Sequence, residues 1–142
     1  MKRLILPVML LAGAFGCDRS SPEARIRKAF EACIQAVEAG DAGTATADLS
    51  PRFEGPEGMD RPMARMFLVG MLSRQKVGVT VLAQKMEVVD REAVQTVDLL
   101  FTGREGNSLL PGESSRRAFR VRWEVRDGKW LIREVQDLQG GP

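Results

Sequence analysis

Cys17 is the residue whose type and position most directly suggest chemistry. It follows a positively charged start (MKR) and an apolar run over residues 4–15. Twelve helical residues span about 18 Å, well short of the roughly 30 Å hydrocarbon core of a bilayer, so the run predicts a secretory signal peptide and not a transmembrane helix. Residues 14–17 (AFGC) resemble a lipobox, in which the cysteine thiol accepts diacylglycerol and becomes the new N-terminus after cleavage.

A second cleavage site lies in the same segment. Residues 12–14 (AGA) form an A-x-A pattern, and cleavage there leaves a secreted periplasmic protein beginning at Phe15, with Cys17 free or paired with Cys33. We expect the lipobox to be used, because Cys17 stands where the apolar run ends and a polar stretch follows at once. Residues 1–16 are then the signal peptide, and residues 17–21 are a tether of at most about 18 Å. Several acyl chains, at about 0.8 kcal/mol per buried CH₂, would hold the protein on the periplasmic side of the cell membrane or outer membrane.

Missing residue types restrict the chemistry of the remaining chain. The sequence has no histidine and no tyrosine. This excludes imidazole acid–base catalysis, the Ser-His-Asp and Cys-His relays and imidazole metal sites. With two cysteines, the chain also has too few ligands for structural zinc. It contains no G-x-G-x-x-G, P-loop or H-E-x-x-H motif. We therefore predict no catalytic residue, no cofactor and no metal site.

The charge of the chain argues against nucleic acid as a partner. The formal net charge of +2 comes from Lys2 and Arg3, and without them the basic residues equal the 19 acidic ones. A neutral domain lacks the basic footprint that nucleic acids require. Five arginines between residues 116 and 126 nevertheless form a basic stripe. We interpret it as the solvated face of an antiparallel strand, paired across strands with acidic residues; contact with anionic headgroups or an acidic partner is the alternative.

Three further groups could carry chemistry. Cys33 lies on the apolar face of a predicted helix, which favours a buried, inert thiol. Glu54, Glu57 and Asp60 could offer oxygen ligands to a hard cation, but their spacing fits a solvated acidic loop better. Asp98 is the carboxylate best placed on a strand, yet it is out of phase with the neighbouring apolar residues and should point away from the core.

The hydrophobic period changes from about 3.6 to 2 near residue 76, which predicts helices followed by strands. We expect three helices, at residues 22–39, 41–49 and 61–74, with a loop at 52–60. Four antiparallel strands follow, at 77–89, 93–102, 116–126 and 129–138, with a polar loop at 103–115 and a frayed end at 139–142. The predicted class is α+β, with the first and third helices covering the apolar face of the sheet. The residues expected to line the core or a pocket are Phe30, Phe53, Met66, Phe67, Phe101, Trp123 and Trp130.

The order of elements resembles a known superfamily. A capped first helix ending in AVEAGD, a break at LSPRF, a third helix and a final hairpin VRWEVRDGKWLIREVQD are similar to nuclear transport factor 2-like, or cystatin-like, proteins. The resemblance covers residues 22–138, nearly the whole mature chain. It implies a curved sheet wrapped round helices into a cone with an apolar pocket, and a tendency to dimerise through the outer face of the sheet.

The resemblance implies two classes of function. The first is a membrane-anchored, non-catalytic binding or accessory domain, whose cone holds a small apolar ligand or is filled by side chains. Its partners would be membrane lipid through the acyl anchor and a second copy or another envelope protein. The alternative is a small enzyme of the polyketide cyclase or ketosteroid isomerase kind. Such an enzyme would need a carboxylate base, because the tyrosine and histidine that relatives use are missing.

Overall fold

The computed structural model describes residues 21–103 and 116–138. The lipobox with Cys17, most of the polar loop predicted at 103–115 and the frayed end predicted at 139–142 lie outside these residues. Three α-helices form in the order that the sequence predicts. Helix α1 (Pro22–Glu38) is capped by Ser21, α2 (Ala42–Ala45) by Asp41 and α3 (Arg61–Arg74) by Asp60, and each cap accepts a hydrogen bond from a backbone N–H of the first turn. The second helix is much shorter than the predicted span of 41–49.

The sheet has five strands, one more than predicted. In spatial order they are β1 (Leu49–Glu54), β5 (Lys129–Asp137), β4 (Arg116–Arg126), β3 (Glu92–Gly103) and β2 (Val77–Val89). The additional strand, β1, runs parallel to β5, whereas the other neighbours are antiparallel. Pro51 favoured a loop in the sequence, but proline is tolerated in an edge strand, and β1 lies at the edge. A short 3₁₀ helix, η1 (Pro56–Gly58), joins β1 to the segment before α3.

Two irregularities change which side chains face the core. The pairing of β2 with β3 shifts between Val81 and Ala83, and the pairing of β4 with β5 shifts beside Trp123, so Leu82 and Arg133 are extra residues. Each such bulge reverses the alternation of the strand beyond it and bends the sheet. Val79 and Val81 face the core before the first bulge, whereas Met86 and Val88 do so after it. A strict two-residue period could not predict this reversal.

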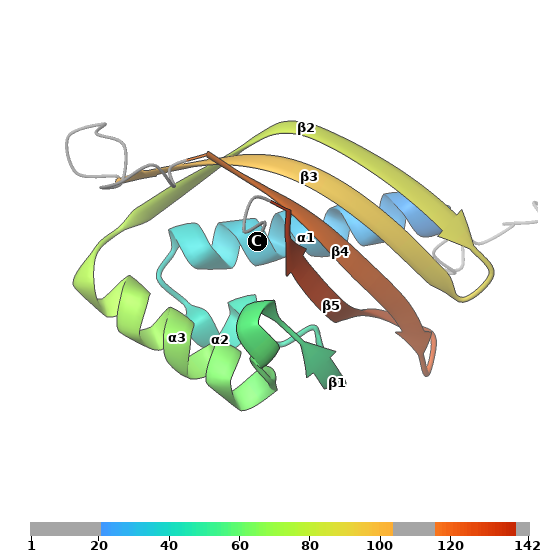
Figure 1. Ribbon diagram of the computed structural model, residues 1–142, viewed down its shortest axis with the longest axis horizontal. Coiled ribbons are helices and arrows are strands. Elements are labelled where there is room, and N and C mark those ends of the chain that lie inside the picture. Colours follow the sequence, from blue (N-terminus) through green and yellow to red (C-terminus); the bar gives the residue numbers. More distant parts are fainter. Residues whose placement is uncertain (1–20, 104–115, 139–142) are drawn as a thin grey trace, which may run out of the picture.

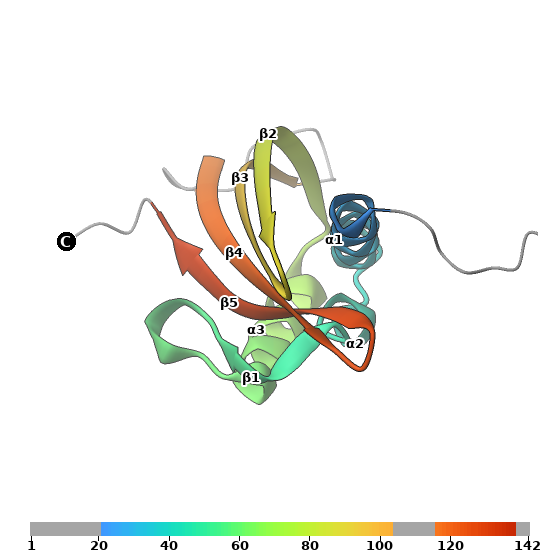
Figure 2. The same cartoon turned by 90° about the vertical axis from the view of Figure 1, so that its right-hand side faces the viewer.

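The core lies between α1 and the inner face of the curved sheet, which we define as the face that carries Val97, Val121 and Trp123 (Figure 1). Ile26 and Phe30 of α1 pack against this face. Helix α3 lies instead beside α2 and β1, at the edge of the sheet (Figure 2). The third helix therefore meets the sheet at its edge strand β1, with Ala64 in the core, and not across the face that α1 covers.

Candidate functional site

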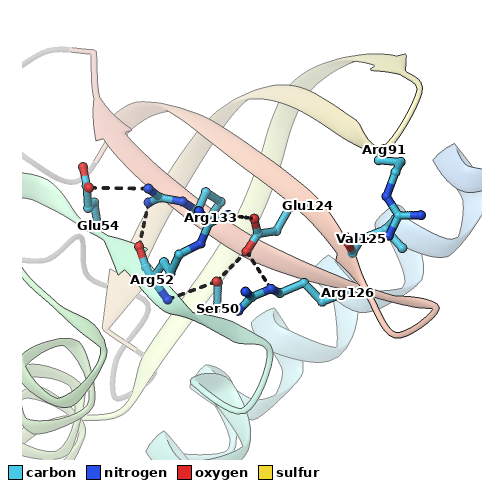
Figure 3. Close-up of polar contacts among 8 residues, drawn as sticks. All are labelled: Ser50, Arg52, Glu54, Arg91, Glu124, Val125, Arg126 and Arg133. Atoms are coloured by element: carbon cyan, nitrogen blue, oxygen red, sulfur yellow. Dashed lines mark hydrogen bonds and ion pairs between the residues drawn. The ribbon is translucent and has the colours of Figure 1, made fainter.

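The most connected polar cluster is centred on a carboxylate on the outer face of the sheet, which is the face that does not carry Trp123. Glu124 is 9% exposed. Its Oε1 accepts a 2.6 Å hydrogen bond from Ser50 Oγ, and its Oε2 accepts a 2.7 Å hydrogen bond from Arg52 Nη2. Arg126 Nε lies 3.8 Å from Oε1 (Figure 3). Burial raises the pKa of Glu124, but the hydrogen bonds from Ser50 and Arg52 outweigh it and hold the pKa below its usual range. Glu124 is thus an ionised structural anion at neutral pH and not a proton acceptor there.

The same cluster attaches β1 to the sheet. Arg133, the extra residue of the β5 bulge, donates from Nη1 to the backbone oxygen of Arg52 at 2.6 Å. Its Nη2 lies 3.6 Å from Glu54 (Figure 3). Because these bonds join β1 to β5 while Glu124 reaches β1 from β4, the cluster fixes the one parallel strand pair. Sequence reasoning missed the cluster, because Ser50 and Arg52 were assigned to a helix end and a loop.

An open cavity of about 740 Å³ lies beside this cluster, at the end of the sheet where β4 turns into β5. Its lining residues are Pro51, Arg91, Val125, Arg126, Asp127, Lys129 and Leu131. Three of them are cationic and one is anionic. An open, polar hollow with this charge suits an anionic group better than an apolar ligand.

The two turns beside the cavity are bonded to each other and to α1. Arg91, in the β2–β3 turn, donates from Nη2 to the backbone oxygen of Val125 at 3.3 Å, and its own backbone oxygen accepts from Val125 N at 3.1 Å. Arg25 in α1 donates from Nη2 to the backbone oxygen of Gly128 at 2.7 Å. The N-terminus of α1, the β2–β3 turn and the β4–β5 hairpin therefore form one end of the molecule (Figure 1), which we call the hairpin end.

Inside the sheet, a polar chain crosses the core. Trp123 Nε1 donates to Gln95 Oε1 at 3.0 Å, and Gln95 Nε2 donates to Gln84 Oε1 at 3.2 Å. Trp130 Nε1 is buried and finds no hydrogen-bond partner in the described part of the chain. Of the residues predicted to line the core, Phe30, Phe53, Trp123 and Trp130 are buried. Phe101 is half-buried and packs edge-on against Phe119, with ring centroids 6.5 Å apart.

Two residues predicted to line the core lie at the surface of the described chain. Met66 is 75% exposed and Phe67 is 57% exposed. The only buried residue of α3 is Ala64. The physical reason is the position of α3 at the edge of the sheet. There it buries little of its surface against its neighbours and leaves most of its apolar residues in solvent.

The carboxylate considered as a base points away from the core, as predicted. Asp98 accepts from Arg116 Nη2 at 2.5 Å and from Arg116 Nε at 3.1 Å. This hydrogen bonding from Arg116 holds the pKa of Asp98 below its usual range. In the arginine stripe of β4, Arg126 faces Glu124 on the outer face. Arg117, in register with Leu99, lies on the inner face instead and bonds Asp137 at 2.6 Å.

The remaining candidates show no reactive arrangement. Cys33 Sγ donates to the backbone oxygen of Ala45 at 3.3 Å. Burial, and then the charge of Asp48, raise the pKa of the Cys33 thiol to about 11, which is the behaviour of an inert thiol. Glu54 contacts Arg133 and Asp60 caps α3, and the described residues contain no group of three or more potential metal ligands.

Comparisons with known proteins support the fold. No family model and no curated protein matches the sequence. Among solved structures, the chain is similar to a nuclear transport factor 2-like protein with a cystatin-like fold from Novosphingobium aromaticivorans (TM-score 0.68, 13% identity, 84% of this chain and 83% of that one). It is also similar to a nuclear transport factor 2-like protein from Cytophaga hutchinsonii (TM-score 0.63, 14% identity, 83% and 98%).

A third similar structure is described as a putative calcium/calmodulin dependent protein kinase II association domain from Xanthomonas campestris (TM-score 0.66, 16% identity, 83% and 87%). At these identities the likeness concerns the fold alone. The chain has the α+β nuclear transport factor 2-like, or cystatin-like, fold with a curved five-stranded sheet.

Proposed function

We propose that the protein is an envelope lipoprotein, anchored through an acylated Cys17, whose nuclear transport factor 2-like domain is a non-catalytic binding module. The observation that carries the second part is the polar content of the interior. The buried polar or charged side chains of the described residues are Thr46, Ser50, Gln95 and Glu124, and of these Gln95 is the one in the sheet's inner face. An amide neither takes nor releases a proton near neutral pH, so this buried side chain is not a base. The inner-face carboxylate of Asp137, in register with Phe119, is held by Arg117 at 2.6 Å.

The carboxylates support the same proposal. An enzyme of the cyclase or isomerase kind would need an Asp or Glu directed into the cone. Asp98 is bonded to Arg116 on the outer face, and Glu124 is bonded to Ser50 and Arg52 there. Both pKa values are lowered, whereas a catalytic carboxylate base in an apolar pocket has a raised pKa. The open cavity beside Arg91, Arg126 and Lys129 is the binding surface that we assign.

The anchor is supported by the sequence pattern at residues 1–17 and by the position of the first helix. Among the described residues, no helix is long and apolar enough to cross a bilayer. Attachment through Cys17 would then be the membrane contact of the mature protein.

The decisive experiment is the intact mass of the mature protein purified from its host membranes. The proposal expects a diacylglycerol-modified chain beginning at Cys17, and a C17S variant that is recovered without lipid. An unmodified chain beginning at Phe15 would contradict the anchor. The non-catalytic assignment is tested by assaying the wild type against a panel of substrates. Turnover that is abolished in E124Q, D98N or any other carboxylate variant would contradict it.

A further inference from the structure

We infer that the hairpin end of the domain faces the bilayer and binds anionic lipid headgroups. The inference rests on the proposed acyl anchor at Cys17 and deepens it, because it assigns a ligand class to the open cavity and an orientation to the domain.

The first support is the place where the tether joins the fold. Helix α1 begins at Pro22, and the four residues between it and Cys17 extend at most about 18 Å from the lipidated residue. The start of α1 lies in the hairpin end, where Arg25 bonds the backbone of Gly128 (Figure 1). A tether of this length that leaves from this end keeps the hairpin end within reach of the headgroups.

The second support is the state of the cations there. Arg25 and Arg91 both donate to backbone carbonyl oxygens, of Gly128 and Val125. A carbonyl bond orients a guanidinium but does not cancel its charge. Among the described residues, the ion pair of Arg126 is a long one, 3.8 Å from a Glu124 that already accepts hydrogen bonds from Ser50 and Arg52. These side chains keep donors for a phosphate group, which arginine binds through parallel N–H bonds.

Lys129 completes the basic rim of the cavity. Its Nζ lies 2.9 Å from Asp48, but the lysine side chain is 63% exposed, so its pairing is weak in water. Each basic side chain close to an anionic membrane surface increases binding to that surface about fivefold. The effect falls off within a Debye length of about 10 Å at 0.1 M salt and reaches further at low salt.

Three of the acidic residues of this end have backbone reasons for being there, whereas Glu92 and Asp48 do not. Asp90 and Asp127 are the acidic residues at the tips of the two turns, and their φ angles are 55° and 51°. Aspartate and asparagine tolerate this left-handed conformation better than other residues with a Cβ. Glu23 lies in the first turn of α1, where a negative charge stabilises the helix dipole. Asparagine at the turns should thus keep the fold while removing the negative charge.

The experiment uses the mature chain from residue 17 with Cys17→Ser, so that no acyl group contributes to binding. All described core residues lie beyond residue 21, and the chain therefore keeps its entire core. Cosedimentation is measured with vesicles of phosphatidylcholine alone and with one part in three of phosphatidylglycerol, at low salt. The double variant R91Q/R126Q should lower partitioning onto the anionic vesicles by about 25-fold.

The matched control is R120Q/R122Q, which removes the same charge from the exposed face of β4, at positions that pair with Gln136 and Glu134 and not with the hairpin. It should partition like the parent, and D90N/D127N should partition more strongly. Far-ultraviolet circular dichroism and a melting curve confirm that each variant is folded. No binding of the parent, or an equal loss in both arginine pairs, would overturn the inference.

Inorganic phosphate distinguishes a headgroup from a free anion. If millimolar phosphate binds the parent and displaces it from vesicles more than the same ionic strength of chloride does, the cavity is a soluble-anion site and the inference fails. The two proposals fail separately. If the native protein is acylated but its unacylated form does not bind anionic vesicles, the proposed anchor stands and the proposed lipid-binding surface is contradicted. If Cys17 is unmodified but the protein binds anionic vesicles strongly, the surface stands and the anchor is contradicted.

Discussion

Trp123 Nε1 donates a 3.0 Å hydrogen bond to Oε1 of Gln95, and both side chains are almost completely buried. The bond crosses from β4 to β3, and Gln95 continues it to Gln84 on β2. A buried amide without partners would cost about 1–3 kcal/mol, so Gln95 is compatible with the core only because its oxygen and nitrogen are both bonded. The chain of contacts therefore fixes the register of three strands from inside the core.

We predict that Trp123→Phe destabilises the protein more than Trp130→Phe. Both indoles are buried, but Trp130 Nε1 has no partner in the described residues, whereas the loss of Trp123 Nε1 leaves Gln95 Oε1 unsatisfied. The difference in the free energy of unfolding between the two variants should be about 1–3 kcal/mol. Urea denaturation measures it, provided that the slope with denaturant is unchanged.

A double mutant separates the hydrogen bond from the loss of volume. Gln95→Leu removes the stranded acceptor, so Trp123→Phe should cost less in that background than in the wild type. Equal costs in the two backgrounds would mean that the indole contributes by packing alone.

The positions of these residues explain how far the sequence could predict the fold. Local signals were sufficient for α3, whose span of 61–74 was predicted, and for the strands β2 to β5. The strand β1 could not be predicted in this way. Its partner β5 is about 80 residues away, its pairing is parallel, and Pro51 interrupts the strand pattern. Tertiary pairing overrides local propensity there.

The candidate site was less predictable than the fold for a related reason. Gln95 was not chosen as a core residue because it is polar, and its burial depends on Trp123 and Gln84 in other strands. Glu124 was read as part of a solvated face, yet Ser50 and Arg52 of the unpredicted strand enclose it. Met66 and Phe67 were predicted to line the core because they are apolar, but α3 lies at the edge of the sheet and leaves both of them exposed.

We predict that Glu124→Gln destabilises the fold by loosening β1. Two short hydrogen bonds, from Ser50 and Arg52, converge on the carboxylate. The loss should be about 1–2 kcal/mol, below that of a fully buried ion pair, because Arg52 is 59% exposed and water can solvate it. Asp98→Asn is the control, and it should cost less because its pair with Arg116 lies on the surface. If D98N costs as much as E124Q, the cluster has no special role.

The same carboxylate predicts an acid dependence. The pKa of Glu124 is lower in the folded protein than its ordinary value of 4.5, so the unfolded chain binds more protons as the pH falls below that value. The stabilisation is complete above about pH 5 and is lost as the pH falls through the folded-state pKa. The gap in unfolding free energy between wild type and E124Q should therefore narrow between pH 5 and pH 3. A gap that widens on acidification would contradict the assignment.

We predict that Cys33 reacts slowly with thiol reagents. Its pKa is raised from 9.0 to about 11, so at pH 8 the thiolate fraction is about 100-fold below that of an ordinary cysteine. Alkylation by iodoacetamide should be slower than that of a cysteine peptide by at least this factor. The measurement uses the C17S chain, in which Cys33 is the only thiol. Rapid alkylation of folded protein would mean that the α1–α2 contact opens, since Sγ bonds Ala45 there.

We predict that the apolar residues of α3 contribute little to the stability of a single chain. Met66→Ser should change the free energy of unfolding by less than about 0.5 kcal/mol, as is usual for surface positions, whereas Phe30→Ala should cost about 3–5 kcal/mol. The contrast follows from burial, since Met66 is 75% exposed and Phe30 is 8% exposed. Denaturation at two protein concentrations tests it. Two results together would mean that a second copy covers α3: a loss above 1 kcal/mol for Met66→Ser, and a parent protein whose stability rises with protein concentration. Only association makes stability depend on concentration.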